Sequence, residues 1–227
     1  MVFLLSIVGL GRAQVLPPAP EAPASFGTTV VRPFGLRGEI YLIKRGTERL
    51  PNFDKLEPVG VIYTTYLKVP PQNTFTLGFP GFERRKEWFA IDYKGRFYVD
   101  PPGKYAFALI SDDGSKLYID GRTVIDNDGQ HSSTTETGSV TLAGGIHTIR
   151  VSYFQGPCMN RIDPCVELQL GVKPPGAPEF RYFTTEEFKP PSNPADWKYG
   201  DPSQLQDPPD PNAGRRKLRD TLKKAPK

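Results

Sequence analysis

The feature that most constrains this chain is a series of short runs in which apolar and polar residues alternate. In residues 145–153, Ile149, Val151 and Tyr153 share one face, and polar side chains take the other. The run at 166–170 alternates in the same way. A period of two residues places successive side chains on opposite faces of a strand. We therefore predict half-buried β-strands through the middle of the chain.

Turn signals separate these runs at short intervals, which is typical of a β-sandwich. The pair Asp120-Gly121 joins the runs at 116–119 and 123–125 and predicts a two-residue hairpin turn. The 25 prolines and 22 glycines are too many for a helical bundle. The predicted fold class is all-β, an antiparallel β-sandwich with irregular N- and C-terminal extensions.

Two further strand predictions rest on weaker patterns. We expect a turn at Lys94-Gly95 between strands at 88–93 and 97–99, because lysine and glycine interrupt the apolar run there. We expect one earlier strand over residues 61–69. After the sandwich, a short helix following Thr184 is also expected, with a threonine as its cap.

The chain divides by composition into five predicted parts. The first residues form an apolar run of about ten residues, the length of a signal-peptide core, with a membrane anchor as the alternative. If the run is a signal peptide, the mature chain has no transmembrane span. The predicted parts are a signal peptide (1–13), a Pro-rich linker (14–35), the β-sandwich (36–172), an aromatic extension packing on the sandwich (173–198) and a disordered basic tail (199–227).

The distribution of charge argues against a nucleic-acid partner. The formal net charge is +4, but residues 212–227 hold seven basic side chains and one acidic one. The rest of the chain is therefore slightly acidic. A groove-binding domain instead spreads lysine and arginine across a folded face.

The two cysteines, Cys158 and Cys165, lie close together in a predicted loop. In an exported protein a disulfide between them is expected. Two sulfurs with no nearby histidine make a poor zinc site. The structural role is thus favoured over metal or redox chemistry.

Motifs for catalysis are missing from the sequence. His131 and His147 are the only histidines, which limits acid–base catalysis, and no nucleophile, metalloprotease or phosphate-binding motif occurs. The stretch Asp126-Asn127-Asp128-Gly129 lacks the first and last ligands of a calcium-binding helix–loop–helix, so we interpret it as a loop built on Asx turns. We predict a protein that is not an enzyme.

A series of motifs in the second half of the sandwich region identifies a family resemblance. Residues 103–129 read GKYAFALISDDGSKLYIDGRTVIDNDG, and they are followed by His131, a Gly-Ile-His strand start at 145–147 and the strand IRVSYFQG. The order of these motifs resembles the protective-antigen-like (PA-fourteen) domain family, in a bacterial exported member. The family is a β-sandwich attached to toxins, glycosidases and adhesins, often as a carbohydrate-binding module.

The resemblance implies a calcium site. Sugar-binding members of the family hold Ca²⁺ on two consecutive aspartates joined by a cis peptide, and the matching positions here are Asp112 and Asp113. Those members place an asparagine as the third ligand where this chain has Gln155. Asn160 or Asp163, in the loop between the cysteines, is the alternative source of that ligand. The other interpretation of the aspartate pair is a turn whose carboxylates accept backbone N–H bonds.

The functional hypothesis is a secreted, periplasmic or cell-surface module that binds a glycan or cell-surface polysaccharide. Its predicted glycan-binding residues are Asp112, Asp113, Gln155 and Asn160, and the first three are the predicted Ca²⁺ ligands. The alternative is a structural or protein-interaction component of the bacterial cell envelope, whose basic tail contacts anionic surfaces.

Overall fold

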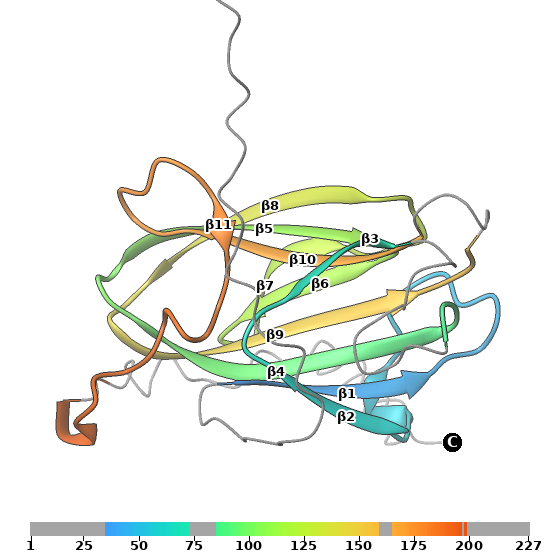
Figure 1. Cartoon of the computed structure of the whole chain (residues 1–227), viewed down its shortest axis with the longest axis horizontal. Helices are drawn as coiled ribbons and strands as arrows, with labels where there is room; N and C mark the ends of the chain where they lie inside the picture. Colours follow the sequence, from blue (N-terminus) through green and yellow to red (C-terminus); the bar gives the residue numbers. More distant parts are fainter. Residues whose placement is uncertain (1–34, 73–84, 159–164, 197, 199–227) are drawn as a thin grey trace, which may run out of the picture. The chain divides into compact units, whose positions relative to one another are not determined.

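Two antiparallel sheets face each other in the computed structural model, which describes residues 35–72, 85–158, 165–196 and 198. The six-stranded sheet has the order β2-β1-β4-β9-β6-β7, and the five-stranded sheet has the order β11-β10-β5-β8, with β3 also paired to β10 (Figure 1). The strands are β1 (Leu36–Leu42), β2 (Gly60–Thr64), β3 (Lys68–Gln72), β4 (Phe89–Val99), β5 (Gly103–Asp112), β6 (Ser115–Ile119), β7 (Arg122–Asn127), β8 (Thr134–Leu142), β9 (Gly145–Gln155), β10 (Val166–Lys173) and β11 (Arg181–Tyr182). The predicted fold class, an antiparallel β-sandwich, is confirmed.

Helical structure in the described part of the chain is limited to two short 3₁₀ turns, η1 (Phe53–Lys55) and η2 (Pro194–Asp196). No helix in these residues has the length and apolar character needed to cross a membrane. The connection from β1 to β2, residues 43–59, contains η1. Phe53 of η1 packs edge-on against Tyr41, with ring centroids 5.1 Å apart, and this contact holds the connection to the six-stranded sheet.

The core lies between the two sheets and is built from aromatic and branched side chains. Fully buried members include Phe89, Phe97, Phe107, Val151 and Tyr153. Burying a side chain of this size contributes roughly 1.5–3 kcal/mol relative to leaving it in water. The alternation predicted for β9 is confirmed for Ile149, Val151 and Tyr153, which enter this core. Ser152 and Phe154, on the opposite face, are buried too, so only the first part of β9 is half-buried. The polar face of β10 is buried as well, so this strand is not half-buried as predicted.

The predicted turn at Lys94-Gly95 is wrong. β4 runs without interruption through both residues and pairs along its length with β9 and, up to Lys94, with β1. A Cβ atom at position 95 would lie 2.8 Å from the carbonyl oxygen of Gly35 and 2.8 Å from a methyl carbon of Leu36. The glycine is therefore required by the close approach of the chain entering β1.

The single strand predicted over residues 61–69 is two strands in different sheets. β2 pairs with β1 in the six-stranded sheet, whereas β3 pairs with β10 in the other sheet. Leu67, between them, is buried and its carbonyl oxygen accepts a bond from the N–H of Leu170. The chain crosses from one sheet to the other here, and a continuous apolar run does not reveal such a crossing.

The predicted Asp120-Gly121 hairpin is confirmed. Both residues have positive φ, +50° and +71°, as a two-residue turn of this kind requires. The Asp120 carboxylate binds His147 Nδ1 at 2.6 Å and the N–H of Thr148 at 2.8 Å, which ties the hairpin to β9. Burial alone lowers the pKa of His147, but the bond to Asp120 raises it above its ordinary value. His147 thus has an architectural role.

The segment after β10 packs on the sandwich through two phenylalanines. Phe183 and Phe188 stack with ring centroids 5.3 Å apart, and both meet Phe97 edge-on. The short helix expected after Thr184 is wrong: residues 185–187 form a turn. Thr184 forms an isolated β-bridge with Tyr66, so the chain is extended at the point where a helix would begin.

Candidate functional site

The two predicted aspartates lie where β5 ends, at one end of the sandwich. Asp112 is the last residue of β5, and the peptide bond that joins it to Asp113 is cis. Gln155, the last residue of β9, and the β7–β8 loop at 128–133 lie against them. The structure therefore brings together Asp112, Asp113 and Gln155, while Asn160 and Asp163 lie outside the described residues.

Asp113 joins three segments through its carboxylate. Oδ1 accepts the backbone N–H of His131 at 3.0 Å, and Oδ2 accepts the N–H of Gly156 at 2.7 Å and Nε2 of Gln155 at 3.1 Å. Burial raises the pKa of Asp113, and the two backbone N–H bonds partly oppose that rise. The side chain is therefore a buried acceptor that fixes the loops around it.

Asp112 faces a carboxylate that the sequence did not single out. Glu167 of β10 is its direct cross-strand partner, and both side chains are almost fully buried. Burial, together with the nearby charges of Asp113 and Glu167, raises the pKa of Asp112 to about 6. Glu167 accepts bonds from Ser133 Oγ and, at 2.5 Å, from Gln169 Nε2. Alternation placed Glu167 on the polar face of its strand, but only the register shows which residue it opposes.

Gln155 is fully buried, and its amide lies between Asp113 and Tyr153. Its Oε1 lies 2.5 Å from the Tyr153 hydroxyl, which also lies 2.6 Å from the carbonyl oxygen of Asp112. A hydroxyl carries one proton and can donate to only one of these two acceptors. One of these two short oxygen–oxygen contacts therefore has no proton from the hydroxyl between its atoms.

The β7–β8 loop brings His131 to the site. The N–H of Asp128 binds Oδ1 of Asp126 at 3.2 Å, so the Asx-turn interpretation of this loop is confirmed. A Cβ atom on Gly114 would lie 2.7 Å from the nitrogen of Gly129. Only glycine at position 114 allows the loop to approach this closely and to present His131 to Asp113.

The comparison with protein families decides what this sandwich is. The family model described as PA14 domain matches residues 68–181, half of the chain. The chain belongs to the PA14 domain family. The resemblance found in the sequence is thereby confirmed, and the matched region contains Asp112, Asp113 and Gln155.

Solved structures support the same fold. The PA14 domain of the MpAFP antifreeze protein is 21% identical, with a TM-score of 0.54 over 71% of this chain and 93% of that one. The PA14 sugar-binding domain from an RTX adhesin is 19% identical, with a TM-score of 0.54 over 67% and 96%. An anti-sigma factor domain-containing protein from Clostridium clariflavum is 19% identical, with a TM-score of 0.51, and the match spans 74% of this chain and half of that one. No curated protein matches the chain.

The side chains at the end of β5 supply some, but not all, of the oxygen ligands that a calcium ion needs. Among the described residues, no three carboxylate, histidine or cysteine side chains are grouped to hold a metal. Two carboxylates and one amide are grouped, and calcium takes six to eight oxygen ligands of mixed type. An ion bound here would therefore need water or ligand oxygens in addition to Asp112 and Asp113.

The predicted disulfide between Cys158 and Cys165 is present. The N–H of Cys158 also binds Glu87 Oε1 at 2.8 Å. These contacts fix the chain just after Gly156, whose N–H binds Asp113. The disulfide thus supports one wall of the candidate site.

Because the pKa of Asp112 is raised, we predict that this residue stabilises the calcium-free PA14 domain less as pH rises. A carboxylate with a lowered pKa has the opposite effect. The folded state binds a proton on Asp112 more tightly than the unfolded state does, so this residue's contribution to stability falls as pH rises from about 4 to about 6. A shift of this size corresponds to at most about 3 kcal/mol. Denaturant unfolding of the wild type and of Asp112→Asn across this range, in a chelator, isolates the effect from other carboxyls. A difference between the two proteins that stays constant with pH would contradict the prediction.

Proposed function

We propose that this PA14 domain is a non-catalytic, exported carbohydrate-binding module that holds a glycan through one Ca²⁺ ion at Asp112 and Asp113. The observation that carries the proposal is the pair of consecutive buried carboxylates at the end of β5. Burial first, and then repulsion from Asp113, raise the pKa of Asp112, and a divalent cation offsets both effects. When bound, the ion supplies open coordination positions that two sugar hydroxyls can occupy.

The Gln155 amide supports this assignment. A half-turn of the amide would let Nε2 donate to the Tyr153 hydroxyl, which could then give its one proton to the carbonyl oxygen of Asp112. The same rotation would bring Oε1 toward Asp113 Oδ2, from which the amide atom now lies 3.1 Å away. Two oxygens this close need a cation or a proton between them. Gln155 would then be the third protein ligand predicted from the sequence.

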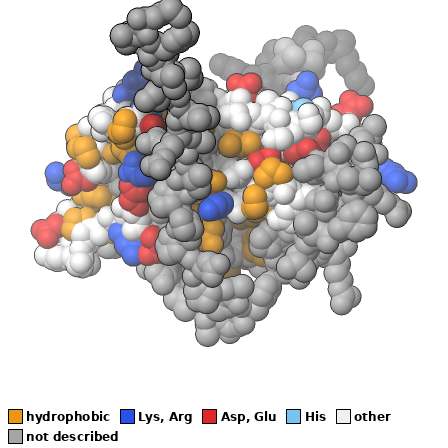
Figure 2. Space-filling view, turned by 45° about the horizontal axis from the view of Figure 1, so that its top comes forward, with side chains coloured by type: hydrophobic (Ala, Val, Ile, Leu, Met, Phe, Trp, Pro, Cys, Tyr) orange, Lys and Arg blue, Asp and Glu red, His pale blue; other side chains and the backbone are white. Residues whose placement is uncertain are grey.

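Other properties of the domain agree with an extracellular binding role. A disulfide is typical of an oxidising compartment. The solved RTX adhesin domain of the same family is described as sugar-binding, and it shares the fold with this chain. On the face that Figure 2 shows, acidic and basic side chains are interspersed with hydrophobic ones, unlike the basic stripe of a nucleic-acid-binding domain.

Calcium titration of the full chain by calorimetry at pH 7.5 tests the proposal. We expect one ion per chain with a dissociation constant between about 1 μM and 1 mM. The Asp112→Asn, Asp113→Asn double variant, which keeps the shape of both side chains, is expected to bind none. A glycan array probed with calcium and with chelator then reports whether sugar binding needs the ion.

Three results would overturn parts of this proposal. If the wild type binds no calcium, the aspartates serve as structural acceptors of N–H bonds. If calcium binds but no glycan does in either condition, the alternative of an envelope component that contacts protein gains support. A double variant that binds calcium as well as the wild type would place the ion elsewhere.

A further inference from the structure

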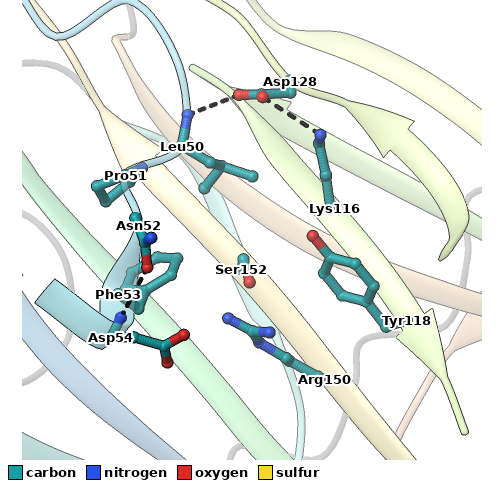
Figure 3. Close-up of a pocket in the computed structure, with 10 residues that line it drawn as sticks. All are labelled: Leu50, Pro51, Asn52, Phe53, Asp54, Lys116, Tyr118, Asp128, Arg150 and Ser152. Atoms are coloured by element: carbon teal, nitrogen blue, oxygen red, sulfur yellow. Dashed lines mark hydrogen bonds and ion pairs between the residues drawn. The ribbon is translucent and has the colours of Figure 1, made fainter. Parts of the chain in front are cut away.

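A cleft lies on the outer face of the six-stranded sheet, away from the core and from the proposed calcium site. It has a volume of about 290 Å³ and lies between the β1–β2 connection and strands β6 and β9 (Figure 3). Its lining residues are Leu50, Pro51, Asn52, Phe53, Asp54, Lys116, Tyr118, Asp128, Arg150 and Ser152. The smallest pockets that bind small molecules have volumes of roughly 300 Å³, so the cleft suits a ligand with a single ring.

Arg150 provides hydrogen-bond donors in this cleft. Its Nε binds the buried Asp92 at 2.7 Å, and its guanidinium carbon lies 5.7 Å from the Phe53 ring and 5.2 Å from the Tyr118 ring. The aromatic rings and Asp92 therefore fix the group in place. Within the described part of the chain, the two terminal nitrogens have no hydrogen-bond partner, and the guanidinium points toward the β1–β2 connection (Figure 3). The cleft therefore contains two terminal N–H donor groups in a fixed position, which we call the guanidinium fork of Arg150.

One acceptor, the Asp54 carboxylate, lies across the cleft from this fork. Asp54 of η1 uses its N–H to bind Asn52, and its carboxylate has no partner among the residues that the structure describes. Burial lowers the pKa of Arg150, but the bond to Asp92 raises it above its ordinary value, and the charge of Asp54 adds a smaller rise. A ligand between the two residues would meet donors on one side and an acceptor on the other.

The charges of the cleft favour a neutral ligand. Two of its lining side chains are cationic, Lys116 and Arg150, and two are anionic, Asp54 and Asp128. Lys116 is already paired, 3.0 Å from Asp126 and 3.3 Å from Asp128. An anionic ligand would gain little from Lys116 and would be repelled by Asp54. Hydroxyl groups, which both donate and accept, match this arrangement better.

We propose that this cleft is a second saccharide site, which takes one neutral sugar ring between the guanidinium fork of Arg150 and the carboxylate of Asp54. Planar polar side chains beside aromatic rings are suited to a ring with several hydroxyls and apolar C–H faces. The inference goes beyond the calcium site, because no lining residue is a proposed calcium ligand. The two sites are neighbours through the β7–β8 loop: Asp128 lines the cleft, and the N–H of His131 binds Asp113.

Saturation-transfer NMR on the full chain in a chelator tests the site with calcium removed. The probes are glucose, galactose, mannose and N-acetylglucosamine. We expect transfer to at least one of them, because the chelator removes calcium and leaves the residues of the cleft in place. Asp54→Ala is expected to weaken binding tenfold or more. Glu57→Ala is the matched control, because it removes an exposed acid from the same connection without touching the cleft.

Each other outcome overturns the inference. No transfer to any of the four sugars in the chelator would remove the second site and leave the calcium site untouched. Equal transfer in the wild type and Asp54→Ala would place the sugar elsewhere. Tighter binding of glucuronate than of glucose would make the cleft an anion site and contradict the neutral assignment.

Discussion

Replacing Asp113 with alanine is expected to lower the free energy of unfolding of the calcium-free protein by about 3 kcal/mol and to abolish calcium binding. Asp113 accepts three N–H bonds, from His131, Gly156 and Gln155. Bonds to a charged acceptor contribute roughly 1.5–3 kcal/mol each, and relief of the buried charge offsets part of that sum. The change thus removes both a proposed ligand and the contact point of three segments.

Urea unfolding at pH 7.5, with chelator and then with excess calcium, measures both effects. Added calcium should stabilise the wild type and leave Asp113→Ala unchanged, because a ligand stabilises only the state that binds it. Glu136→Ala is the control, since Glu136 is an exposed acid on β8. That variant should lose less than about 1 kcal/mol. Equal stability of Asp113→Ala and wild type in the chelator would refute the structural role.

The second large effect is expected from Gly138→Ala, which should cost about 3 kcal/mol of stability. Gly138 lies on β8, at the edge of the five-stranded sheet, where this strand passes β7 of the other sheet. A Cβ atom there would lie 2.2 Å from the carbonyl oxygen of Val124 and 3.0 Å from its carbonyl carbon. These are backbone atoms, so the methyl group can be accommodated only by moving one strand away from the other.

Thermal and urea unfolding of Gly138→Ala measure this cost. Gly171→Ala is the matched control, because the nearest atom to its added Cβ is the carbonyl oxygen of Arg181 at an ordinary contact distance of 3.5 Å. The control should change stability by less than about 1 kcal/mol. Because β7 and β8 flank the loop that carries His131, Gly138→Ala should also weaken calcium binding. If Gly138→Ala is as stable as the wild type, the prediction is wrong and the two sheet edges separate at no cost in stability.

Much of the fold follows from local sequence. Alternation in β9 reports which side chains enter the core, and Asp120-Gly121 specifies its hairpin because both residues tolerate positive φ. The order of motifs around Asp112 and Asp113 was sufficient to identify the family. These features depend on a few consecutive residues, which is why the sequence alone determined them.

Tertiary structure decided the remaining features, because each depends on a partner distant in the chain. Gly95 lies within a strand since the entrance to β1 packs against it. Glu167 stands beside Asp112 only through the register of β10 on β5. Arg150 faces a cleft because the β1–β2 connection folds across its strand and places Asp54 opposite. Alternation assigns a side chain to a face of a sheet, but it carries no information about which neighbouring strand or loop meets that face.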